Sequence, residues 1–308
     1  MAAGLVPGGI GGDGGGSIRI PSACCGLFGL KPQRGRVTTA PSPHLWWALG
    51  TAGTLARSVL DSALVYDVIR GSAEGDLWTA GPVGSFVAAA QREPGRLRIG
   101  WSTRPALHGV RPVPLHVAVV RDTARLLAGL GHDVREVDPR YPDMTAAFVP
   151  QFFAGIRSEA DEVEHYGRLE RRTRQSYRMG TWVTPRVRDF ALRATERVAR
   201  RANRVFDDVD VLLTPTMAHR PPETGIIAGT GTVRASLRAL PAIAYAAIWN
   251  VAGNPAAAVP RGIGHDGLPL SVQLVGPTDG EELLLSLSAQ LEAAAPWPKV
   301  AAAPTKIG

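Results

Sequence analysis

The chain has 308 residues, of which 45% are hydrophobic and 20% are charged, a globular composition that can bury a core. No stretch approaches the ~20 apolar residues of a membrane span, and the glycine-rich N-terminus lacks the basic and apolar regions of a secretory signal. The two cysteines, Cys24 and Cys25, are neighbours, which excludes a disulfide framework and a cysteine-rich zinc site. These features predict a cytoplasmic protein without a metal site.

The formal net charge is +7, and arginine supplies most of the positive charge because lysine occurs only at positions 31, 299 and 306. We attribute this balance to the codon bias of a GC-rich genome; the alternative is a nucleic-acid surface. Arginines cluster on one flank of a predicted helix, at Arg193, Arg197, Arg200, Arg201 and Arg204. Because no aromatic side chains are interleaved with them, we interpret this flank as a solvated helix face and predict no nucleic-acid partner.

The first half of the chain alternates helix and strand patterns. Residues 57–70 carry apolar side chains at helical spacing. Residues 97–101 are typical of a short buried strand, residues 115–130 of an amphipathic helix, and residues 133–137 of an alternating strand. A strand, a helix and a strand over this distance form a βαβ unit, which predicts parallel pairing within a sheet.

The second half opens with a charged, mostly helical segment over residues 158–206. The strands predicted after it are 209–216, 256–260 and 268–276. The dipeptide Asp266-Gly267 fits a hairpin turn between the last two of these strands. A final helix is predicted over 280–293, followed by a disordered tail of about 295–308. Without an internal repeat or a linker, the chain is predicted to form a single α/β domain over 1–308.

The most informative stretch is residues 11–37, which begins GGDGGGSIRIP. Three glycines directly before Ser17 relax the steric limits on the backbone, so that successive N–H groups can converge on one point. Such a point can hold an oxyanion next to a nucleophilic hydroxyl. Asp13 and Arg19 flank the serine, and an ion pair between them would brace the loop. The alternatives have less support, since the phosphate-binding pattern GxxxxGK[ST] and the nucleophile elbow GxSxG are both absent.

This stretch resembles the defining motif of the amidase signature family, G-T-D-x-G-G-S-I-R-x-P-A followed by G-x-x-G-L-K-P-x-x-G-R-V. The matching residues are Gly12, Asp13, Gly15, Gly16, Ser17, Ile18, Arg19, Pro21, Gly26, Gly29, Leu30, Lys31, Pro32, Gly35, Arg36 and Val37. The likeness continues through GTLARSV, VDVLLTPT and the run from IWNVAG to SVQLVG, and is weakest over 140–205. It implies the amidase signature fold, an α/β fold whose mixed β-sheet core is flanked by helices.

The resemblance implies an amidase that hydrolyses a carbon–nitrogen amide bond through an acyl-enzyme on Ser17. The oxyanion hole would consist of the backbone amides of Gly14, Gly15, Gly16 and Ser17. Asp13 and Arg19 would be structural supports of the loop. The family activates its nucleophile through a Ser–cis-Ser–Lys relay and uses no metal or organic cofactor. The expected partner is a small-molecule amide, and a homodimer is left open.

The chain departs from the family in its catalytic base. The family's lysine and bridging cis-serine precede the nucleophile motif, and both are absent from this chain. Lys31 belongs to the later GLKP part of the motif and Ser22 stands where the family has alanine, so neither replaces them. We therefore expect the N-terminal part of the family domain to be missing, through a start assigned too late, a truncated gene, or a second chain that supplies the rest. The alternative function is an inactive remnant or an interaction module.

The substrate stays open. Ile20 stands where the tRNA-dependent amidotransferase subunit usually has glutamine, which favours a general amidase. The run CCGLFGLKPQRGRV is most similar to the group of 6-aminohexanoate cyclic-dimer hydrolases. Trp46 and Trp47 follow the motif, and for them we favour ordinary packing over a place in the acyl pocket.

Overall fold

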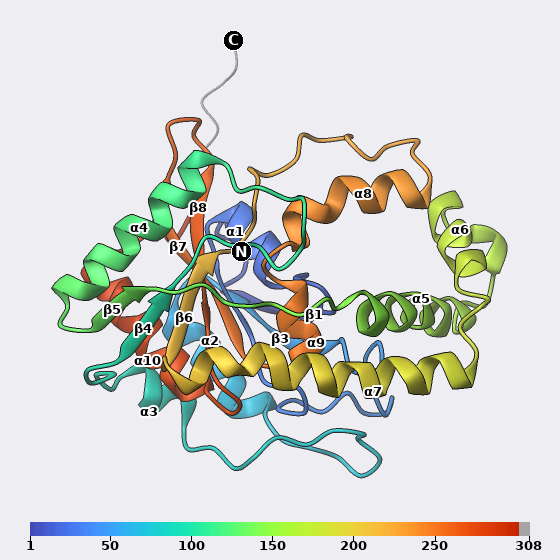
Figure 1. Cartoon of the computed structure of the whole chain (residues 1–308), viewed down its shortest axis with the longest axis horizontal. Coiled ribbons are helices and arrows are strands. Elements are labelled where there is room, and N and C mark those ends of the chain that lie inside the picture. Colours follow the sequence, from blue (N-terminus) through green and yellow to red (C-terminus); the bar gives the residue numbers. More distant parts are fainter. Residues whose placement is uncertain (302–308) are drawn as a thin grey trace.

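The computed structural model describes residues 1–301 and builds them around an eight-stranded mixed sheet (Figure 1). The strand order across the sheet is β1-β3-β2-β7-β8-β6-β4-β5. The strands are β1 (Gly8–Asp13), β2 (Phe28–Lys31), β3 (Thr51–Ala56), β4 (Arg98–Trp101), β5 (Asp133–Glu136), β6 (Val211–Pro215), β7 (Ala256–Ile263) and β8 (Pro269–Val275). β4 is parallel to β5 and β6, and the other neighbours are antiparallel. The predicted α/β class with a mixed sheet is confirmed.

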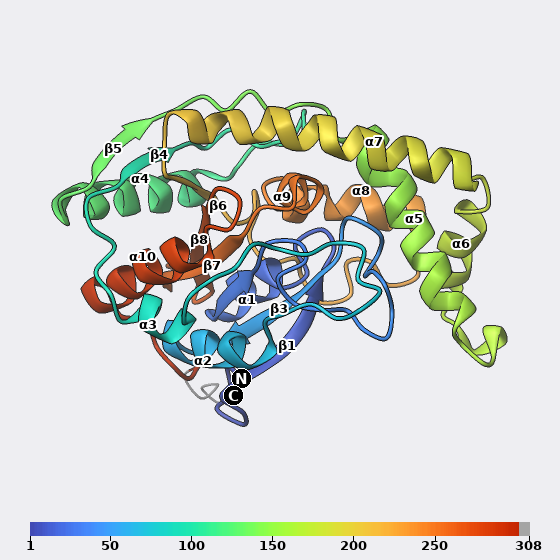
Figure 2. The ribbon, with the colours of Figure 1, turned by 90° about the horizontal axis from the view of Figure 1, so that it is seen from below.

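Helices cover both faces of this sheet. The α-helices of the described part are α1 (Arg19–Cys25), α2 (Val59–Ile69), α3 (Phe86–Ala90), α4 (Pro114–Gly129), α5 (Thr145–Asp161), α6 (Arg171–Met179), α7 (Pro185–Ala202), α8 (Thr232–Ile243), α9 (Ala247–Ala252) and α10 (Glu281–Ala294). Two short 3-10 helices are also present: Tyr166–Arg168 precedes α6, and Asn203–Asp207 follows α7. Figure 2 shows α7 and α10 on opposite sides of the sheet.

The core follows from the alternation of side chains along each strand. On β6, Val211 and Leu213 pack into one cluster with α2, α4 and α10, whereas Leu212 between them packs with α7 and α9. All three side chains are fully buried. A near-continuous apolar strand of this kind is what a sheet covered on both faces requires.

The predicted βαβ unit is confirmed and corresponds to β4, α4 and β5. Ile99 of β4 pairs with Val134 of β5 in parallel register. The predicted hairpin is also confirmed, since β7 and β8 are antiparallel and the N–H of Gly264 donates to the carbonyl of Leu268 across the turn. The helix predicted over 57–70 is α2.

The glycine-rich strand β1 was not predicted. Glycine has little preference for strands, and residues 8–13 contain four of them. The segment becomes a strand by antiparallel pairing with β3, from Gly8 opposite Ala56 to Asp13 opposite Thr51. β1 lies at one edge of the sheet, and its last residue opens the loop that carries Ser17.

The start of the predicted tail, about 295–308, is packed rather than disordered. Trp297 is 4% exposed, and its indole N–H donates to the carbonyl of Arg57 at 3.0 Å. Residues 302–308 lie outside the described residues. They are the rest of that tail and the last residues of the predicted domain 1–308. Within residues 1–301, none of the helices combines the length and apolarity needed to cross a membrane.

Candidate active site

The segment from Gly14 to Ile18 forms a tight loop between the end of β1 and the start of α1. Gly16 has a φ of +125°, a conformation that glycine adopts far more readily than other residues. A Cβ at Gly16 would lie 2.6 Å from Ile20 Cδ1 and 2.9 Å from Ala246 Cβ. The loop therefore needs glycine at this position both for its backbone angle and for space.

We expect Gly16→Ala to lower the free energy of unfolding by about 2–6 kcal/mol, since backbone strain and overpacking each cost ~1–3 kcal/mol. Urea denaturation measures this loss. Gly71→Ala is the matched control, because Gly71 has a φ of +138° but nothing within 4 Å of the added Cβ. The control should lose only the strain contribution. Equal losses in the two variants would contradict the close packing at Gly16.

Asp13 binds two amides of the loop, the first amide of α1 and one guanidinium group. Its carboxylate accepts from the N–H of Gly16 at 2.7 Å, of Ile18 at 3.1 Å and of Arg19 at 3.4 Å. Arg19 Nη2 lies 3.0 Å from Asp13 Oδ1, and both side chains are fully buried. Burial alone would raise the pKa of Asp13, but the charge and hydrogen bonds of Arg19 outweigh it and hold that pKa well below its ordinary value. A buried carboxylate that is ionised at neutral pH thus holds the loop.

Two side chains from the C-terminal half complete this network. Arg19 Nη2 donates to Asn250 Oδ1 at 2.6 Å, and Nη1 donates to Gln273 Oε1 at 2.8 Å. Asn250 Nδ2 in turn donates to the carbonyl of Asp13 at 2.6 Å. Neither residue was predicted from the sequence. Each is a polar side chain within an apolar run, IWNVAG for Asn250 and SVQLVG for Gln273. Because buried polar groups are hydrogen-bonded, a polar residue that interrupts an apolar run is the signal that could have identified them.

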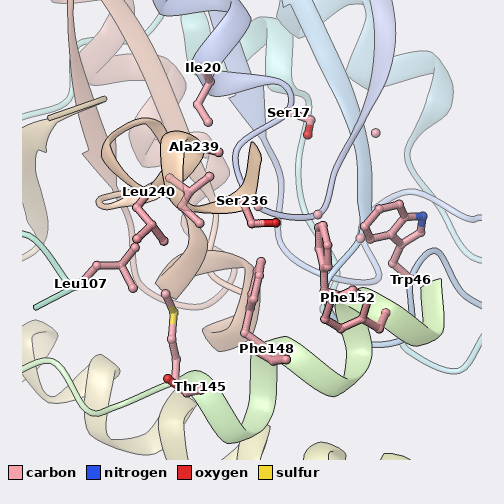
Figure 3. Close-up of a pocket in the computed structure, with 18 of the residues that line it drawn as sticks. Ser17, Ile20, Trp46, Leu107, Thr145, Phe148, Phe152, Ser236, Ala239 and Leu240 are labelled. Atoms are coloured by element: carbon pink, nitrogen blue, oxygen red, sulfur yellow. The ribbon is translucent and has the colours of Figure 1, made fainter. Parts of the chain in front are cut away.

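The side chain of Ser17 is exposed and lies at a cavity (Figure 3). Within residues 1–301, the backbone N–H groups of Gly14, Gly15 and Ser17 meet no hydrogen-bond acceptor. Gly16 was expected to be a fourth donor, but its N–H instead donates to Asp13 Oδ1. The loop therefore has three backbone N–H groups without an acceptor in residues 1–301 and one exposed hydroxyl, and N–H groups of this kind can bind an oxyanion.

The cavity beside Ser17 has a volume of about 610 Å³, within the usual range for small-molecule sites. Its apolar lining consists of Ile20, Leu45, Trp46, Leu107, Met144, Phe148, Val149, Phe152, Phe153, Met179, Val233, Leu237, Ala239, Leu240 and Ile243. In Figure 3, Phe152 and Trp46 lie on one side of the cavity, and Leu240 and Leu107 lie on the other. The sequence predicted the loop but not the helices α5 and α8, which supply much of this lining.

The two tryptophans after the motif have different surroundings. Trp46 lines the cavity, with its ring edge-on to Phe152 at 5.3 Å between centroids. Trp47 lies outside it, and the guanidinium carbon of Arg188 lies 4.4 Å from the centre of its ring. Ordinary packing, which the sequence favoured for both, describes Trp47, whereas Trp46 both packs against a core cluster and lines the cavity.

Trp46 also lies between α5 and the loop of Ser17. Gly155 makes room for the ring on α5, because a Cβ there would lie 2.6 Å from Trp46 Cδ2. On the loop side, a Cβ at Gly14 would lie 3.5 Å from Trp46 Cε3. The indole N–H donates to the carboxylate of Glu159 near the end of α5. The ring is thus fixed from both sides and from its edge.

The cavity contains no evident base for Ser17. No lysine or histidine of residues 1–301 lines it, and Glu159 is its only acidic lining residue. Lys31 on β2 is fully buried away from the cavity, and its Nζ donates to the carbonyl of Pro32 at 2.7 Å. Burial, together with the charge of Arg19, lowers the pKa of Lys31 well below its ordinary value.

The site has no candidate metal ligands among the described residues, and the arginine flank lies apart from it. The part of the chain that the structure describes has no group of three or more His, Cys, Asp or Glu side chains that could hold a metal ion. Arg197, Arg200 and Arg201 of α7 and Arg204 of the 3-10 helix after it line a separate groove. None of these arginines lines the cavity beside Ser17.

The family model "Amidase" matches residues 1–285 of the chain. The chain belongs to the amidase family. This amidase-family chain is 47% identical over 300 residues to "Putative amidase AmiB2" of Mycobacterium tuberculosis, covering 96% of this chain and 63% of that protein. It is 33% identical over 327 residues to 6-aminohexanoate-cyclic-dimer hydrolase of a Pseudomonas species, covering 96% of this chain and 65% of the relative.

Solved structures of amidases have the same fold. A 6-aminohexanoate cyclic dimer hydrolase complexed with substrate superposes with a TM-score of 0.88 at 30% identity, covering 96% of this chain and 66% of that one. A bacterial aryl acylamidase of the amidase signature family superposes with a TM-score of 0.80 at 25% identity, covering 96% and 64%. The resemblance inferred from the motif is confirmed. The chain spans 63% of the length of the mycobacterial relative.

Proposed function

We propose that the protein is an amidase that cleaves a carbon–nitrogen bond of a small-molecule amide, with Ser17 as the nucleophile. The observation that carries this proposal is the juxtaposition of the exposed Ser17 hydroxyl, three N–H groups without an acceptor in residues 1–301, and a cavity of about 610 Å³. Membership of the amidase family supports the same reaction.

In this mechanism Ser17 Oγ attacks the amide carbonyl carbon and the carbonyl oxygen becomes an oxyanion. The N–H groups of Gly14, Gly15 and Ser17 bind that oxyanion, and Asp13 and Arg19 hold the loop that aims them. When the intermediate collapses, the carbon–nitrogen bond breaks, the leaving amine takes up the proton that Ser17 Oγ gave to the base, and an ester is left on Ser17. Water then attacks the ester and releases the acid. None of these steps calls for a metal or an organic cofactor.

The proton of Ser17 needs an acceptor, and the cavity wall within residues 1–301 offers no lysine or histidine. The family resemblance implies a bridging serine and a lysine in this role. We propose that this relay comes from the part of its relatives' length that the present chain does not span. Lys31 is not proposed for it, because its Nζ is buried beside Pro32.

Detection of an acyl-enzyme on Ser17 tests the proposed function. Protein isolated from its native cells is mixed with an aryl amide, quenched in acid and digested with trypsin. The first lysine or arginine of the chain is Arg19, and Ser17 is the only hydroxyl in residues 1–19. We expect the acyl mass on this peptide, released by hydroxylamine as an ester. An acyl group found only on another peptide would contradict Ser17 as the nucleophile.

A catalytically inactive remnant or an interaction module is the second candidate. It is favoured by the missing base in the part of the cavity that residues 1–301 line. It predicts no acyl adduct and no turnover of any amide. An intact mass equal to that of the 308-residue chain, together with this inactivity, would establish it. A larger mass with turnover would support the amidase.

We further propose that the protein acts in the cytoplasm and needs no nucleic-acid partner. The groove lined by the arginines of α7 is separate from the cavity, which supports a small molecule as the substrate. A homodimer remains a prediction, and gel filtration with light scattering would test it.

A further inference from the structure

One side chain of the cavity wall carries a charge. Among residues 1–301, Glu159 near the end of α5 is the only acidic residue that lines the cavity, and no arginine, lysine or histidine does. We propose that Glu159 binds an ammonium group of the substrate, so that the site selects amides with a primary amine at the end remote from the attacked carbonyl. This inference rests on the proposed function, because it assigns a substrate class to the same Ser17 site.

The carboxylate of Glu159 has room for a further donor. Its Oε1 accepts from the indole N–H of Trp46, and its Oε2 accepts from no residue of the described part. Glu159 also forms no ion pair within residues 1–301. The guanidinium carbon of Arg157, two residues earlier on α5, lies instead 4.8 Å from the centre of the Tyr177 ring. The cavity wall therefore holds a negative charge without a counter-charge, and an ammonium group offers three N–H donors to it.

The aromatic rings beside Glu159 suit the same ligand. Trp46 is edge-on to Phe152 at 5.3 Å between centroids, and Phe148 stacks on Phe152 at 5.7 Å. All three rings line the cavity (Figure 3). A cation is attracted to the face of an aromatic ring. An ammonium group in the cavity therefore meets aromatic faces as well as the carboxylate, whereas a carboxylate carried by the substrate would meet Glu159 as a like charge.

The indole of Trp46 separates Glu159 from the proposed oxyanion hole. Its Cε3 would lie 3.5 Å from a Cβ at Gly14, and its Nε1, on the opposite edge of the ring, donates to Glu159. Along α5, Glu159 follows Phe148 by eleven residues, which is about 16 Å of helix. The Phe148 ring itself lies 3.4 Å from a Cβ built at Gly15. An amide held by its carbonyl oxygen at this loop can therefore reach Glu159 only with its far end.

Binding without turnover tests this inference. The full chain with Ser17→Ala is titrated calorimetrically with 5-aminopentanamide and with pentanamide, which lacks the ammonium group. We expect 5-aminopentanamide to bind about tenfold more tightly at low salt, since an exposed ion pair and a cation–π contact together have effects of this size. The preference should shrink in about 1 M sodium chloride, which screens exposed charges. Equal affinities of the two amides at low salt would overturn the inference.

A second substitution tests whether Glu159 is the source of the preference. Glu159→Gln, added to Ser17→Ala, removes the charge but keeps an oxygen that can accept from the indole N–H of Trp46. It should abolish the preference for 5-aminopentanamide and leave the affinity for pentanamide unchanged. Glu162→Gln is the matched control, because Glu162 is exposed at the end of the same helix and outside the cavity, and it should keep the preference. A preference that survives Glu159→Gln would overturn the assignment to Glu159.

These binding measurements separate the two proposals. If Ser17→Ala prefers 5-aminopentanamide but the native protein forms no acyl-enzyme, the proposed function fails and the ammonium site stands. If the native protein forms the acyl-enzyme but Ser17→Ala binds the two amides equally, the amidase stands and the ammonium site fails.

Discussion

Ser17→Ala is expected to lower the turnover of an aryl amide such as hexananilide by about 10⁴-fold or more. Loss of a catalytic nucleophile has effects of this size, because the remaining groups can only bind the substrate and stabilise charge. Release of aniline by the protein from its native cells measures the rate. The free energy of unfolding should change by less than about 0.5 kcal/mol, because the side chain is exposed.

The matched control for this variant is Ser72→Ala. Ser72 is an exposed serine outside the cavity, so its hydroxyl has no part in the proposed reaction. Its variant should keep the turnover of the parent protein. Substantial activity in Ser17→Ala would show that another group attacks the amide.

Asp13→Asn is expected to lower the free energy of unfolding by about 3–5 kcal/mol. The substitution leaves the guanidinium of Arg19 fully buried without its counter-charge, and breaking a buried ion pair from one side has this cost. Denaturant unfolding measures the loss. Asp122→Asn is the control, because Asp122 and Arg125 form an ion pair whose side chains are 66% and 77% exposed, which is worth at most about 1 kcal/mol.

The stability difference between the parent and Asp13→Asn should also depend on pH. The pKa of Asp13 is lower in the folded chain than its ordinary value of 3.8. The carboxylate therefore contributes its full stabilisation above that value, and the contribution falls as the pH drops below it toward the folded pKa. The difference should be constant near neutral pH and narrow below about pH 4. A difference that stays constant down to pH 3 would contradict an ionised Asp13 in the folded protein.

Much of the fold could be predicted because its strands and helices have strong periodic patterns. The βαβ unit around Ile99 and Val134 and the hairpin at Gly264 follow from apolar spacing and turn residues. β1 could not be predicted in this way, since its glycines carry no pattern and its strand conformation depends on pairing with β3.

The candidate site also has a part that could be predicted from the sequence and a part that could not. Ser17 and its neighbours could be identified because the motif is local in sequence. The cavity walls could not, because α5 contains Pro150 and α8 contains Pro241, and an internal proline argues against a helix. Asn250 and Gln273 reach the loop only through the fold, from 231 and 254 residues away from Arg19 along the chain. Tertiary packing, not local preference, determines these parts of the site.

The position of Trp46 constrains how such a protein can change its preferred amide. The same indole borders the cavity, fills the space left by Gly155 and lies against Gly14 of the loop that carries Ser17. A smaller residue at 46 would enlarge the cavity but would also remove support from the loop of Ser17, the proposed nucleophile. α8 carries no member of the Asp13 network, so Leu237 and Leu240 can vary without that penalty. Diversification of amide preference in this scaffold is therefore expected to concentrate on α8.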